Sequence, residues 1–267
     1  WTVFADGVSA TAAATVTGLT NGQAYTFRVS ATNSVGTGAT SVVSASVTPA
    51  TVPGAPTSVA GTAGNTQVSL TWTAPASNGG AAITDYVVES SPDGTTWTVF
   101  ADGVSTVASA TVTGLTNGQA YTFRVAASNS AGTGATSTVS GSVTPRTVPG
   151  APTSVAGTPG NTQVSLTWTA PASNGGAAIT DYVVEFNDGA TWATFADGTS
   201  TAASATVTGL ANGTPYTFRV AATNVAGTGA TSTVSAAVTP RTVPGAPTSV
   251  AGTAGNAQVS LTWTAPV

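Results

Sequence analysis

Apolar and polar residues alternate in several short stretches of this chain. In Tyr121–Val125 the apolar side chains occupy every second position, and the same holds for Val68, Leu70 and Trp72. A period of two places alternate side chains on opposite faces of a β-strand, so each stretch predicts a strand with one buried face. The repeating segments lack the 3.6-residue period of an amphipathic helix. The pattern therefore predicts an all-β chain.

The predicted strands belong to a unit that is repeated along the chain. An Asn-Gly turn signal precedes a Tyr-Thr-Phe-Arg-Val strand three times, and its tyrosines recur at intervals of 96 and 95 residues. A leucine lies six residues before each tyrosine, which gives the pairs Leu19 and Tyr25, Leu115 and Tyr121, and Leu210 and Tyr216. The sequence TVPGAP recurs at 51–56, 147–152 and 242–247, and its prolines predict short, stiff linkers.

These linkers divide the chain into four segments. Residues 51–146 and 147–241 are each expected to form a complete two-sheet β-sandwich of seven short strands. In the first of these, AGTGATS at 131–137 is expected to be a turn before the last strand. Residues 1–50 hold the later strands of one unit, and residues 242–267 hold the first two strands of another. We expect either the same chain's continuation or neighbouring chains to complete these two partial units.

Several spaced motifs resemble the fibronectin type III family over the whole chain. They are the tryptophan on the second strand, the leucine–tyrosine pair, the YTFRV strand and the A-x-N-x-x-G-x-G pattern that follows it. The resemblance implies an immunoglobulin-like sandwich in which each leucine–tyrosine pair pins a crossover between strands. It also implies structural roles for the second-strand tryptophans, which are Trp72, Trp168 and Trp263.

The composition argues against an enzyme. Without His, Cys or Lys, the chain offers only carboxylates, hydroxyls and Arg for proton transfer or nucleophilic attack. Asp85 and Glu89 are four residues apart on a predicted strand, about 13 Å along the backbone, whereas glycosidase pairs need about 5–9.5 Å. Five other aspartates lie in Asp-Gly turns without the ligand spacing of a calcium loop: Asp6, Asp93, Asp102, Asp188 and Asp197. We therefore expect no catalytic residues, no cofactor and no metal.

Charge and hydropathy narrow the range of partners. The net charge of −4 comes from only 5% charged residues, which does not predict a nucleic-acid surface. No apolar run approaches the ~20 residues of a membrane-spanning helix, so we expect no membrane insertion in this segment.

The few charges are predicted to pair across strands. Arg124 should face outward beside Asp85 or Glu89 on a neighbouring strand, and the next unit repeats the arrangement with Arg219 and either Asp181 or Glu185. Such exposed pairs contribute about 0–1 kcal/mol, so their expected role is to fix strand register.

Two functional hypotheses from different classes remain. The uncharged surface of small residues, repeated in each unit, favours a structural segment of a long extracellular or cell-surface protein, which we expect to be bacterial. It would form a stalk, filament or surface layer that associates with copies of itself or continues as the same array. The alternative is a spacer or adhesion module of a secreted polysaccharide-acting or cell-surface protein. The row of Trp1, Trp97 and Trp192 could then stack on a carbohydrate or cell-surface ligand, although packing over a sheet edge is the commoner role for such residues.

Overall fold

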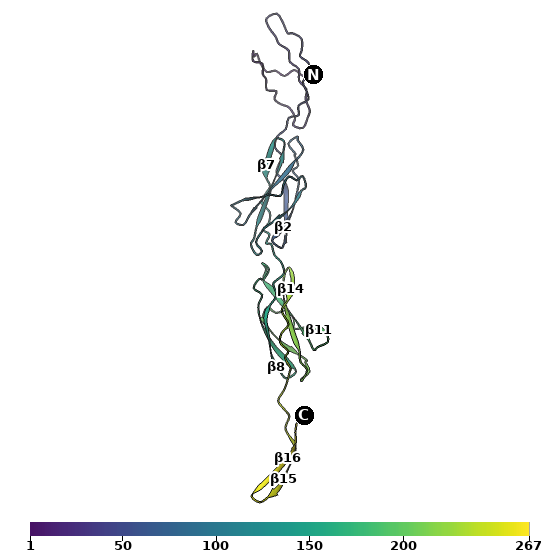
Figure 1. Cartoon of the computed structure of the whole chain (residues 1–267). Helices are drawn as coiled ribbons and strands as arrows, with labels where there is room; N and C mark the ends of the chain where they lie inside the picture. Colours follow the sequence, from purple (N-terminus) through teal and green to yellow (C-terminus); the bar gives the residue numbers. More distant parts are fainter. Residues whose placement is uncertain (267) are drawn as a thin grey trace. The chain divides into compact units, whose positions relative to one another are not determined.

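The computed structural model describes residues 1–266 and contains β-strands but no helix among them. The chain divides into two compact units, residues 1–146 and 147–267. In each unit two antiparallel sheets enclose one hydrophobic core, and the second unit also contains a separate two-stranded sheet. This architecture confirms the predicted all-β fold of tandem β-sandwiches (Figure 1).

The first complete module, residues 51–146, contains seven strands in two sheets. One sheet has the order β1-β2-β5, formed by β1 (Thr57–Gly64), β2 (Gln67–Thr73) and β5 (Ser109–Thr113). The other has the order β4-β3-β6-β7, formed by β4 (Thr98–Phe100), β3 (Asp85–Ser91), β6 (Thr122–Asn129) and β7 (Gly132–Thr136). Every neighbouring pair is antiparallel.

The second complete module, residues 147–241, repeats this topology. Its three-stranded sheet has the order β8-β9-β12, formed by β8 (Thr153–Gly160), β9 (Gln163–Thr169) and β12 (Ser204–Thr208). Its four-stranded sheet has the order β11-β10-β13-β14, formed by β11 (Trp192–Phe195), β10 (Ile179–Asn187), β13 (Thr217–Asn224) and β14 (Gly227–Thr231).

Alternating side chains from both sheets build the core of each module. On β2, Val68, Leu70 and Trp72 are buried, while the residues between them are exposed. They pack in one cluster with Val88 of β3 and Phe123 of β6. Burying an aliphatic or Phe side chain of this size contributes roughly 1.5–3 kcal/mol, so this interior supplies the main stabilisation of the sandwich.

The last strand begins earlier than the sequence predicts. The expected turn at 131–137 is wrong, because Gly132–Thr136 forms strand β7 and the turn occupies Ser130 and Ala131. The physical reason is a side-chain hydrogen bond that closes a tighter turn: the Ala131 N–H donates to Asn129 Oδ1 at 2.8 Å. The glycines therefore belong to the strand that follows this turn.

Beyond β7 the edge of the sheet is irregular, and two serines hold it to β6. The Ser137 N–H donates to the Val125 carbonyl at 2.8 Å. In return, the Val125 N–H donates to Ser137 Oγ at 3.1 Å rather than to a carbonyl. Ser140 makes the same pair of bonds with Phe123. Hydroxyl oxygens thus replace backbone acceptors along this edge.

The two partial units have local β structure without a closed core. Residues 1–50 contain no extended strand, only isolated bridges that include Tyr25 to Val47. In the last segment, β15 (Thr248–Gly255) and β16 (Gln258–Thr264) form a hairpin. Trp263 on this hairpin is 58% exposed, whereas Trp72 at the matching position is 7% exposed. The difference arises because Trp72 packs against strands of a complete module.

Candidate functional site

The charged residues of the first module meet on the β3–β6 pair. Glu89 and Arg124 are direct partners in the register, so their side chains share the outer face of the sheet. Arg124 Nε donates to Glu89 Oε2 at 2.6 Å. The same guanidinium lies over the ring of Trp97, with Cζ 4.2 Å from the ring centroid. Trp97 therefore packs on the sheet through a cation–π contact.

The second module repeats this cluster. Arg219 Nε donates to Glu185 Oε2 at 2.6 Å, and its guanidinium lies 4.3 Å from the centroid of the Trp192 ring. Within the first unit, Arg28 stacks on Trp1 in the same way, at 4.2 Å. The row of tryptophans considered from sequence is thus occupied on one face by arginines of the same chain.

The remaining strand aspartates have a different role from the glutamates. Asp85 Oδ1 accepts a hydrogen bond from the Ser105 N–H at 2.9 Å, and Asp181 Oδ1 accepts one from the Ser200 N–H at 2.9 Å. Each aspartate therefore fastens the loop that precedes β5 or β12. Since the aspartate and the glutamate of each strand are engaged with separate groups, they do not act as a carboxylate pair.

Another aspartate organises the hairpin between β3 and β4. Asp93 Oδ1 accepts hydrogen bonds from the N–H groups of Thr96 and Thr95 and from the Ser91 hydroxyl. These donors, the two backbone groups above all, hold the pKa of the Asp93 carboxyl well below its usual range. Among residues 1–266, no group of three His, Cys, Asp or Glu side chains could hold a metal ion. The carboxylate of Asp93 serves turn geometry.

The tyrosines at the start of the Tyr-Thr-Phe-Arg-Val strands bond back to the preceding turns. The Tyr121 hydroxyl accepts the Thr116 N–H at 3.2 Å, and the Tyr216 hydroxyl accepts the Ala211 N–H at 3.1 Å. Tyr25 makes the corresponding bond with the Thr20 N–H at 3.0 Å. Leu115 and Leu210 are buried in the cores next to these turns, while Leu19 is half-buried. Tyr121 and Tyr216 therefore each fix a crossover between the two sheets of their module, while Tyr25 makes the same bond in a segment without sheets.

Of the three second-strand tryptophans, Trp72 and Trp168 lie in closed cores and Trp263 is exposed. Trp72 and Trp168 are buried and each meets a tyrosine edge-on, Tyr86 and Tyr182, with ring centroids 5.2 Å apart. Burial raises the pKa of the Tyr86 hydroxyl. Within residues 1–266, neither buried indole nitrogen has a hydrogen-bond partner. These aromatic pairs belong to the core and offer no reactive group to a ligand.

A buried asparagine that the sequence reasoning did not single out connects three segments of the first module. Asn129 Nδ2 donates to the carbonyls of Thr51 and Asn78, each at 2.8 Å, and its Oδ1 accepts the Ala131 N–H. Asn224 makes the same three bonds in the second module, to Thr147, Asn174 and Ala226. The signal available in the sequence was the Asn within A-x-N-x-x-G-x-G. The contacts of this Asn could not be foreseen, because they include a residue 78 positions away.

A second asparagine pair joins the two turns at one end of each sandwich. Asn117 Nδ2 donates to Asn65 Oδ1 at 2.8 Å, and Asn117 Oδ1 accepts the Thr66 N–H at 2.8 Å. Asn212, Asn161 and Thr162 repeat this arrangement. The asparagine of each of these Asn-Gly turns therefore also makes hydrogen bonds to the turn between the first two strands of its module.

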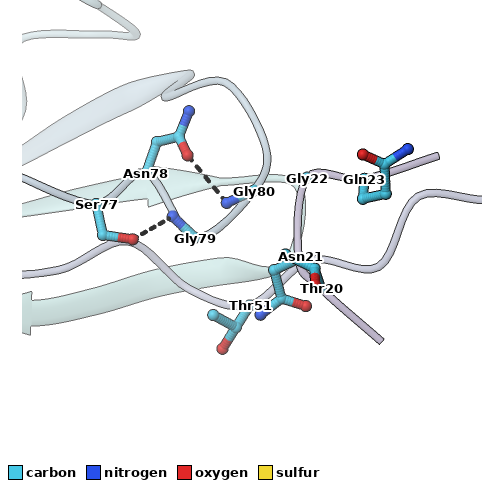
Figure 2. A pocket seen from close by; sticks show the side chains of 9 residues that line it. All are labelled: Thr20, Asn21, Gly22, Gln23, Thr51, Ser77, Asn78, Gly79 and Gly80. Atoms are coloured by element: carbon cyan, nitrogen blue, oxygen red, sulfur yellow. Dashed lines mark hydrogen bonds between the residues drawn. The ribbon is translucent and has the colours of Figure 1, made fainter. Parts of the chain in front are cut away.

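An open pocket of about 550 Å³ lies in the first unit, beside the linker residue Thr51. The turn Thr20–Gln23 and the loop Ser77–Gly80 form its walls (Figure 2). Figure 2 shows the loop closing on itself: the Gly80 N–H donates to Asn78 Oδ1, and the Gly79 N–H donates to Ser77 Oγ. None of the lining residues is charged or aromatic, so the pocket lacks the groups needed for acid–base chemistry or sugar stacking.

The model of the family "Fibronectin type III domain" matches residues 54–142 and 150–238, which together make up more than half of the chain. Among curated proteins, Fibronectin type-III domain-containing protein 3a of Gallus gallus is 33% identical over 65% of this chain. Myomesin-2 of Homo sapiens is 30% identical over 81% of this chain. Chitinase A1 of Niallia circulans is 37% identical over 60% of this chain.

These relatives are much longer proteins, and the chain spans between 15% and 22% of their lengths. The similarity therefore concerns a repeated module within them. No helix in residues 1–266 is both long and apolar enough to cross a membrane. With two matched modules and the topology described above, the chain belongs to the fibronectin type III family, whose modules are generally non-catalytic.

Proposed function

We propose that this chain is a non-catalytic structural segment of a longer extracellular or cell-surface protein, in which repeated sandwiches supply length as a stalk, filament or surface layer. The observation that carries the proposal is the attachment of the linker to the module that follows it. The Thr51 N–H donates to the Gly79 carbonyl at 2.8 Å, and the Gly54 N–H donates to the Ser77 carbonyl at 2.9 Å. A linker bonded in this way sets the spacing between modules as a stiff segment does.

The partners proposed for this segment are further modules of the same array or other copies of the same chain. Self-association through the sandwich faces would not meet repulsion between like charges, because only 5% of the residues are charged. No nucleic acid or cofactor is required by this function.

The proposal is tested by imaging the native protein and by stretching the chain with an atomic force microscope. Stretching should give a regular sawtooth pattern, because a module of 95 or 96 residues releases about 300 Å of chain when it unfolds. Native material should appear as filaments or as an ordered surface layer. A protein that remains a dispersed monomer at high concentration would contradict the filament and layer forms.

The second candidate is a spacer or adhesion module of a secreted polysaccharide-acting protein. The similarity to Chitinase A1, which is named for action on a polysaccharide, favours it. In this case a catalytic or sugar-binding domain would flank the modules, with few further repeats. Sedimentation of the chain with chitin or cellulose particles tests the adhesion form: retention of the chain supports it, whereas release into the supernatant contradicts it. The spacer form is distinguished from the structural candidate by the flanking domains.

A further inference from the structure

Two glycine turns in the first unit touch each other through their backbones. A Cβ atom placed on Gly80 would lie 2.3 Å from the Gly22 nitrogen and 2.7 Å from the Asn21 carbonyl carbon. A Cβ placed on Gly22 would lie 3.1 Å from the Gly80 Cα. Both glycines have positive φ, +83° at Gly22 and +89° at Gly80. The contact therefore needs glycine for its lack of a side chain as well as for its conformation.

Gly22 and Gly79, the neighbour of Gly80, hold the chain on both sides of the boundary between residues 1–50 and the first module. The Gly22 N–H donates to the Pro49 carbonyl at 2.9 Å, which fixes the end of the preceding segment. Next to Gly80, Gly79 accepts the Thr51 N–H, and a Cβ on Gly79 would lie 2.1 Å from the Thr51 oxygen. Ala50 is left as the single residue between these two attachments.

A connection through one residue alone would allow rotation about its two backbone dihedral angles. The backbone contact between Gly22 and Gly80 gives the two segments a second point of attachment, away from the covalent connection. Asn129 strengthens the covalent side of the joint because its Nδ2 donates to the Thr51 carbonyl. Rotation about Ala50 is then opposed by contacts on two sides.

We propose that Gly22 and Gly80 form a glycine joint that locks the first module against the segment preceding it and prevents swivelling at Ala50. The joint rests on contacts inside residues 1–146 and does not depend on the proposed extracellular role. It assigns a function in orientation to the Asn-Gly turn and to the Asn-Gly-Gly loop, beyond the chain reversal that their sequences predict.

The test uses distances between two spin labels in the full chain. Because the sequence contains no cysteine, Thr40→Cys and Thr111→Cys introduce two unique labelling sites, both at exposed positions on opposite sides of Ala50. The background carrying only these two changes should give one narrow distance distribution. Gly80→Ala should shift or broaden it, because a Cβ 2.3 Å from a backbone nitrogen must move outward by about 1 Å to reach van der Waals separation.

The matched control is Gly94→Ala. Gly94 also has positive φ, +75°, but a Cβ there has no neighbour within 4 Å, so the change adds backbone strain without a clash. Gly22→Ala changes the joint at a residue that lies outside the module. A shift of the distance distribution in this variant would therefore not reflect damage to the core of residues 51–146. The proposal predicts altered distributions for Gly80→Ala and Gly22→Ala and an unaltered one for Gly94→Ala. A broad distribution in the unsubstituted background, or narrow unshifted distributions in both joint variants, would overturn it.

Discussion

Replacement of the buried Asn129 by alanine should destabilise the first module by about 2–4 kcal/mol. The side chain makes three hydrogen bonds, to the Thr51 and Asn78 carbonyls and from the Ala131 N–H. Each such bond contributes about 0.5–1.5 kcal/mol net, and unpaired buried groups add a desolvation cost that surrounding water can only partly relieve. Asn129 is only 7% exposed, so water reaches these groups poorly.

Amide hydrogen exchange measures this loss inside the intact chain. The slowest amides of β2 and β6 exchange through unfolding of their module, so a loss of 2–4 kcal/mol should accelerate them about 30- to 1,000-fold, at 1.36 kcal/mol per tenfold change. The corresponding amides of β9 and β13 report on the second module and serve as an internal control. An acceleration below about twofold in β2 and β6, or one equal in both modules, would refute the reasoning.

Asn129→Asp distinguishes the loss of the hydrogen-bond donor from the loss of side-chain volume, which Asn129→Ala combines. Asn129→Asp keeps the shape of the side chain but directs a carboxylate at two carbonyl oxygens, which raises the pKa of the introduced group in the folded state. The folded module then binds a proton more readily than the unfolded chain. Its stability should therefore rise as the pH falls through that raised pKa, whereas Asn129→Ala should show no such recovery.

Three further changes test other parts of the structure. Thr66 has a φ of +53°, so Thr66→Gly should stabilise the module by about 0.5–1 kcal/mol in denaturant unfolding; a loss would show that its strain is compensated locally. Arg124→Lys should cost about 1 kcal/mol, limited by side-chain exposures of 29% for Arg124 and 18% for Glu89, and a double-mutant cycle with Glu89→Gln should show coupling above zero. Asp93 has a depressed pKa in the folded state, so it contributes stability above its ordinary pKa of 3.8 that is lost as the pH falls through the folded value. Asp93→Asn should thus lose less stability than the parent as the pH falls below about 4 in denaturant unfolding, and a loss equal to the parent's would refute this expectation.

The period-two pattern was sufficient to predict strands and their buried faces, because the burial of Val68, Leu70 and Trp72 follows directly from alternation on one strand. The sequence also predicted that the ion-pair partner of Arg124 is either Asp85 or Glu89. Only the register of β3 against β6 places Glu89, and not Asp85, opposite it. That register is set by turns and core contacts that lie outside the two strands.

The contacts of Asn129 and of the glycine joint could not be predicted from local sequence. Asn129 bonds to Thr51, which is 78 positions away, and to Asn78, which is 51 positions away. Gly80 touches a turn in the preceding segment. Their residue types indicate turns, which is true of each loop taken separately. The error at β7 has the same origin, because glycines that look like a turn become strand residues once Asn129 closes the reversal before them.

The serine-bonded edge after β7 affects how near-identical modules can coexist in one polypeptide. During synthesis, a strand of one sandwich could be captured by the open sheet of the next, and such misassembly is a hazard of repeated domains. Along Ser137 to Ser140, hydroxyl oxygens take the amide hydrogens of β6 in place of a regular row of carbonyls. Because this segment departs from regular strand pairing, we expect it to be a poor template for an incoming strand of a neighbouring copy.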